Sequence, residues 1–98
     1  MSNQGSQIQL RPAPTVATST PETGPAVGGT AITLVGTGFT GNNAGTNNPT
    51  IAGASCTSVV AVSNTQITCV TPAGVAGGRV LRVINSNGTS NSIVFTYT

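Results

Sequence analysis

Short segments in which apolar and polar residues alternate recur along most of the chain. Residues 30–35 are the clearest case, because Ile32 and Leu34 fall on one face of an extended strand and the residues between them on the other. Clusters of Gly, Pro and Asn, which favour turns, separate these segments. The pattern predicts strands at 15–19, 30–35, 50–52, 57–62, 66–70, 79–85 and 92–97. About seven short strands at this spacing are typical of an all-β sandwich.

The last two expected strands have a parity that predicts how they pair. Leu81 and Phe95 are both expected to face the core, and residues directly opposite each other share a face of the sheet. An odd-numbered residue such as Phe95 therefore lies opposite Leu81, which requires a connecting loop of odd length. The sequence predicts residues 87–89 as this loop, with one residue in the left-handed conformation, and excludes the two-residue Asn-Gly turn.

The same parity leaves a cluster of side chains on the outer face of the late strand. Val80, Arg82 and Ile84 are expected to point outward, with Val94 beside them on the neighbouring strand. An outward apolar cluster of this kind predicts a surface that binds a partner. The alternative is that these are scattered surface residues of the sort that most folded proteins carry.

The segment that follows the second expected strand breaks the alternation. Gly36 and Gly38 allow a sharp bend, so Phe39 is expected to fold back into the core. Residues 41–48 are only Gly, Asn, Ala and Thr, which predicts an exposed loop.

Residues 1–13 are predicted to form an extended N-terminal arm, and residues 14–98 the sandwich. Polar and apolar side chains alternate through Gln7, Ile8, Gln9, Leu10 and Arg11, which suits an extended segment laid on a sheet edge or groove. These five residues are therefore candidates for binding a partner, with the two apolar ones in shallow pockets. The alternative is a disordered leader.

The charged residues exclude several classes of function. The chain has no His, and Glu22 and three Arg are its only charged side chains. General acid–base catalysis and metal binding need more titratable groups or ligands than this, so we expect no enzyme, no metal and no cofactor. A net charge of +2 is too small for nucleic-acid binding, and no apolar run is long enough to span a membrane. The start at Met1 lacks the pattern of a secretory signal, which predicts synthesis in the cytosol.

Three segments together resemble a known family. Residues 21–25 with 28–34 and 36–39 resemble the opening of an IPT/TIG domain, residues 65–72 its middle signature, and residues 87–91 with 95–97 its closing hairpin. The resemblance covers about residues 14–97. It implies an immunoglobulin-like β-sandwich, and a family of interaction and spacer modules without a shared active site.

The resemblance also bears on the two cysteines. Cys56 and Cys69 fall where some extracellular members of the family carry a bridged pair. If residues 61–64 form the hairpin loop, the two cysteines lie opposite each other, at a separation that suits a disulfide. Closing that loop would stabilise the fold by ~3 kcal/mol. The alternative is two buried, reduced thiols, as expected for a protein that stays in the cytosol.

Three functions are compatible with these observations. The first is a structural protein of a virus particle, most simply a decoration protein that stabilises the capsid of a tailed bacteriophage. Its partners would be capsid or tail subunits, contacted by many copies through the arm at the virion surface. The second is a receptor- or carbohydrate-adhesion module, whose partner would be a glycan on a host surface. The third is a spacer domain of a larger surface protein.

The disulfide has a direct test. If Cys56 and Cys69 are bridged, reduction raises the mass of the intact chain by about two daltons. Mass spectrometry before and after reduction, with the thiols alkylated, measures this change. An unchanged mass excludes the bridge.

Overall fold

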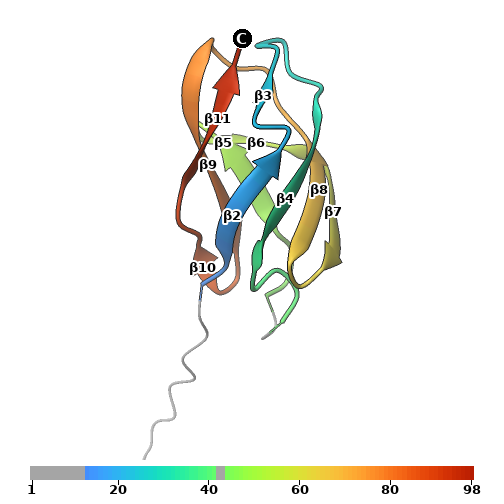
Figure 1. Cartoon of the computed structure of the whole chain (residues 1–98). Coiled ribbons are helices and arrows are strands. Elements are labelled where there is room, and N and C mark those ends of the chain that lie inside the picture. Colours follow the sequence, from blue (N-terminus) through green and yellow to red (C-terminus); the bar gives the residue numbers. More distant parts are fainter. Residues whose placement is uncertain (1–12, 42–43) are drawn as a thin grey trace, which may run out of the picture.

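The alternating segments form two packed β-sheets (Figure 1). The computed structural model describes residues 13–41 and 44–98. The strands in these residues are β2 Thr15–Thr20, β3 Thr23–Gly24, β4 Ala31–Thr37, β5 Asn48–Ile51, β6 Ala54–Ser55, β7 Thr57–Ser63, β8 Gln66–Val70, β9 Gly77–Asn85, β10 Gly88–Thr89 and β11 Ile93–Tyr97. Seven of these described strands have four or more residues, in line with the expected number. The predicted all-β, immunoglobulin-like sandwich is confirmed.

The two sheets differ in size and share no strand. One sheet has the order β3-β11-β9-β5-β6, with β10 paired to β9, and the other has the order β2-β4-β8-β7. All pairs are antiparallel except that of β11 with β3. The long strand β9 therefore lies inside the larger sheet, with β11 on one side and β5 on the other.

The core is built from the inward positions of both sheets. In β4, Ile32 and Leu34 are buried while Val35 is 43% exposed, as the alternation predicts. Phe39 is fully buried, so the predicted return of this ring to the core is confirmed. The other buried apolar side chains are Val16, Ala44, Ile51, Cys56, Ile67, Cys69, Leu81, Val83, Phe95 and Tyr97.

The hairpin of β9 and β11 keeps the predicted parity but not the predicted register. Leu81 lies opposite Ile93, and not opposite Phe95. The predicted three-residue loop is also wrong, because Gly88 pairs with Asn85 across a two-residue turn and adopts a φ of 128°. This register continues to Ser90, whose backbone N–H donates to the Val83 carbonyl at 2.8 Å and whose hydroxyl accepts from the Val83 N–H at 2.8 Å. The pairing then shifts by one residue between Ser90 and Ile93, which restores the parity that the even turn would have reversed.

The β7–β8 hairpin also departs from the predicted register. Ser63 pairs with Gln66, so the turn is shorter than the predicted loop at 61–64. Two irregularities within β7 then move the register only part of the way back toward the predicted one, so that Thr57 lies opposite Val70. Cys56 therefore does not lie opposite Cys69 in the ladder, as the longer loop would have required.

The segment at 41–48 is less exposed than its composition predicts. Ala44 and Asn47 are buried in the described part of this segment. The Asn47 amide donates to the carbonyl of Phe39 at 2.8 Å and accepts from the Asn85 amide at 3.0 Å. Asn residues are common in exposed loops, but here their amide groups hold the loop against the core. A buried amide requires hydrogen-bond partners, and these partners belong to the core strands and turns.

Asn91 connects the two sheets beside the first described strand. Its side-chain oxygen accepts from the backbone N–H of Val16 at 2.9 Å, and its amide nitrogen donates to the Val16 carbonyl at 2.8 Å. Val16 lies in β2 next to a register shift, where the pairing with β4 is interrupted. Asn91 itself lies between β10 and β11. The Asn91 side chain therefore supplies hydrogen bonds to the backbone of β2 at a point where the sheet that contains β2 does not.

We expect Asn91→Ala to lower the free energy of unfolding by about 1–3 kcal/mol, because both polar backbone groups of Val16 lose their partner. Asn91→Asp keeps an acceptor for the N–H and should cost less. Ser92→Ala is the control, because it alters an exposed neighbour. Chemical denaturation of the three variants measures these differences, and equal stability of Asn91→Ala and the control would contradict the role of Asn91.

The environment of Tyr97 predicts that the protein loses stability as the pH becomes alkaline. Its hydroxyl donates to the carbonyl of Pro72 at 2.6 Å, and burial, together with the negative charge of ionised Cys56, raises the pKa of Tyr97 above its usual 10.0. A raised pKa in the folded state means that the contribution of Tyr97 is complete below pH 10.0 and is lost as the pH rises through the folded value. We expect Tyr97→Phe to cost about 1 kcal/mol near neutral pH and to show a smaller alkaline loss. The free energy of unfolding of both proteins is measured from neutral to alkaline pH. If the two values fall by the same amount over this range, the prediction is wrong.

Candidate functional site

The outward cluster predicted on the late strand is present on the outer face of β9. Val80 and Ile84 are 42% and 37% exposed, and Arg82 between them is also exposed. Leu81 and Val83 point the other way and are buried. Val94 lies opposite Val80 and is exposed as well, as predicted. The alternation along β9 is therefore the reason why these three candidate residues share one surface.

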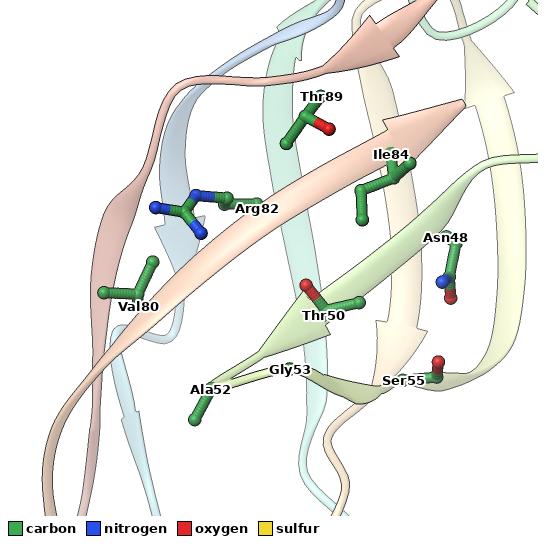
Figure 2. Close-up of a pocket in the computed structure, with 9 residues that line it drawn as sticks. All are labelled: Asn48, Thr50, Ala52, Gly53, Ser55, Val80, Arg82, Ile84 and Thr89. Carbon is green, nitrogen blue, oxygen red and sulfur yellow. The ribbon is translucent and has the colours of Figure 1, made fainter. Parts of the chain in front are cut away.

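A shallow hollow of about 450 Å³ lies on this surface, and we refer to it as the β5–β9 hollow (Figure 2). The register of the sheet creates it, because Thr50 of β5 lies opposite both Arg82 of β9 and Ser55 of β6. Figure 2 shows its side chains projecting from these strands, from β10 and from the turn between β5 and β6. The lining residues are Asn48, Thr50, Ala52, Gly53, Ser55, Val80, Arg82, Ile84 and Thr89.

A tight turn closes the hollow at one end. Ala52 and Gly53 both have positive φ values, 52° and 86°, which brings β6 back alongside β5. The backbone N–H of Ala52 donates to the carbonyl of Val80 at 2.8 Å and fixes the turn to β9. The wall of the hollow is therefore held by backbone hydrogen bonds.

The two described arginines have different roles. Arg79 donates from Nε to the carbonyl of Val75 at 3.0 Å and from an Nη to that of Ala76 at 3.1 Å, so it holds the preceding loop. Arg82 makes no hydrogen bond or ion pair with any of the residues the structure describes. Its guanidinium can therefore donate to a ligand without breaking a contact of the protein.

The other polar lining residues are equally uncommitted. Within residues 13–41 and 44–98, the side chains of Asn48, Thr50, Ser55 and Thr89 make no hydrogen bonds to the protein. These four residues were not predicted from the sequence. The one available signal was the alternation of Thr50 with Ile51, which places the threonine outward, but the pairing of β5 with β9 was not visible in the sequence.

The remaining predicted site residues are either undescribed or buried. Gln7, Ile8, Gln9, Leu10 and Arg11 lie outside the described residues, so the arm at 1–13 stays a prediction. Cys56 and Cys69 are buried free thiols in hydrogen-bond contact. The bond that Cys69 donates lowers the pKa of Cys56, and the same bond together with burial raises the pKa of Cys69. The disulfide also stays a prediction.

No group of three or more His, Cys, Asp or Glu side chains that could hold a metal ion occurs in the described ranges. The same ranges contain no helix long and apolar enough to cross a membrane. The chemistry that the β5–β9 hollow offers is hydrogen bonding by hydroxyl, amide and guanidinium groups.

A family model described as IPT/TIG domain matches residues 14–97. Among curated proteins, none matches the chain.

Solved structures of larger proteins contain similar domains. The extracellular region of plexin A4 is 26% identical over 87% of this chain and 8% of its own, with a TM-score of 0.73. SGBP-B, from a complex xyloglucan utilization locus of Bacteroides uniformis, is 20% identical over 87% of this chain and 23% of its own (TM-score 0.65). An auxiliary nutrient binding protein from Bacteroides thetaiotaomicron is 24% identical over 92% of this chain and 22% of its own (TM-score 0.65). This chain thus spans less than a quarter of each.

Proposed function

The chain belongs to the IPT/TIG domain family, and on that premise we propose that it is a non-catalytic binding module of the adhesion type. Its ligand is a saccharide met at a surface outside the cell, and its binding site is the β5–β9 hollow. The observation that carries the proposal is that every polar side chain lining this hollow is free of hydrogen bonds to the described residues. Sugars are recognised through such hydroxyl and amide groups, because each can donate to or accept from a ring hydroxyl.

The contrast with other polar residues strengthens this interpretation. Asn47, Asn85 and Asn91 are all engaged in hydrogen bonds that hold loops or strands in place. The side chains of Asn48 and Thr50, which follow Asn47 closely in the sequence, make no such bonds within the described residues although they belong to a strand. Polar groups without a structural task, gathered around one hollow, are typical of a ligand site.

Similar domains in other proteins support the setting. The SGBP-B structure comes from a locus for xyloglucan utilization, and a second similar structure is described as a nutrient binding protein. These descriptions favour the adhesion alternative of the sequence analysis over its main hypothesis, the decoration of a bacteriophage capsid. The capsid hypothesis finds no support in the comparisons, and its arm lies outside the described residues.

A glycan array tests the proposal. We expect the chain to bind a defined set of saccharides, and Ser55→Trp to weaken this binding by about tenfold or more, equivalent to roughly 1.4 kcal/mol, because the indole fills the hollow. Thr18→Trp places the same ring on the exposed surface of β2 in the other sheet and serves as the control.

Two results would refute the proposal: failure to bind any saccharide, and equal binding by the two tryptophan variants. Deletion of residues 1–12 separates it from the capsid hypothesis. The proposed site needs no arm, so the deletion should leave saccharide binding unchanged.

A further inference from the structure

We propose that the saccharide recognised by the β5–β9 hollow is acidic, a uronate whose carboxylate pairs with Arg82. This inference rests on the proposed function and adds the chemical class of the ligand. It follows from the charge of the hollow, from the surroundings of that charge and from the shape of the site.

The charge of the hollow is positive and uncompensated. Arg82 is the one ionisable side chain among the nine lining residues. Glu22, the only carboxylate side chain of the chain, precedes β3, and β11 separates that strand from β9. No acidic side chain of the protein therefore pairs with the guanidinium of Arg82. A carboxylate of the ligand is a suitable partner for its planar pair of donors.

The side chains around Arg82 favour this pairing. Val80 and Ile84 stand two positions away on either side in the same strand and on the same face of the sheet. Apolar neighbours exclude water and strengthen a charge-assisted hydrogen bond. Thr50 lies directly opposite Arg82 in β5, and its side chain lines the same hollow. A carboxylate bound here would thus meet a charged donor, a hydroxyl and two apolar walls.

The rest of the hollow suits a sugar ring better than an acidic peptide. Asn48, Ser55 and Thr89 offer side-chain amide and hydroxyl groups at its margin, which match the hydroxyls of a pyranose. The volume of about 450 Å³ is within the usual range for small-ligand sites. The aromatic side chains Phe39, Phe95 and Tyr97 are all buried, so none is available for a sugar to stack on. Recognition must therefore depend on hydrogen bonds and on the charge of Arg82.

The test compares three probes by calorimetry: trigalacturonate, its neutral methyl ester, and a tetraglutamate peptide. We expect trigalacturonate to bind at least about tenfold more tightly than the ester, because the ester cannot form the charged pair. Its affinity should fall as salt is raised. Arg82→Gln should abolish the preference, and Arg82→Lys should keep part of it, since lysine retains the charge but not the planar pair of donors.

Thr18→Glu is the matched control, because it lowers the net charge by one, as Arg82→Gln does, but on the outer surface of the other sheet. It should leave trigalacturonate binding unchanged. Arg82 makes no hydrogen bond or ion pair with the described residues, so its variants should unfold at close to the temperature of the parent chain.

The possible outcomes separate this inference from the proposed function. Equal affinity for trigalacturonate and its ester overturns the acidic ligand but leaves a saccharide site in place. Tighter binding of the peptide than of trigalacturonate overturns the uronate in favour of an acidic protein partner. Loss of affinity in Thr18→Glu equal to that in Arg82→Gln overturns the role of Arg82, because only net charge would then matter. Failure to bind trigalacturonate, together with failure on the glycan array, overturns both proposals.

Discussion

The pairing of β9 with β5 is the interaction on which the core and the β5–β9 hollow both depend. The inward pair of Leu81 and Ile51 is buried, and the outward pair of Arg82 and Thr50 lines the hollow. The same backbone hydrogen bonds fix both pairs, so a slip of one residue would expose the core and bury the arginine. Selection for a stable core therefore also keeps the geometry of the hollow constant.

Features that depend on the local pattern were predictable from the sequence. The alternation from Val80 to Ile84 placed three side chains outward, and the structure agrees. The bend that buries Phe39 followed from two neighbouring glycines. In each case the burial of apolar side chains is the main driving force. The spacing of apolar residues along the sequence shows which side chains are buried, so these features can be predicted from it.

Features that depend on single hydrogen bonds between distant residues were not predictable. The one-residue shift between the pairings of β10 and β11 with β9 lies beside the hydroxyl bond of Ser90, and the irregularity in β2 lies beside the amide bonds of Asn91. Both bonds replace a backbone partner by a side chain, and nothing in the composition of the segment distinguishes them from ordinary turn residues. The polar half of the hollow was missed for a related reason. Asn48 and Thr50 meet β9 only after a pairing between segments far apart in the sequence.

The direction of the first and last described strands has a mechanical consequence. The start of β2 and the C-terminus, which follows β11, lie at opposite ends of the sandwich (Figure 1). Tension between these points acts along the strands, so the rungs between β2 and β4 carry the load together and cannot open one after another. The two bonds from Asn91 to Val16 add resistance where the force enters. Such a domain would resist being pulled apart in flowing liquid even with a modest thermodynamic stability.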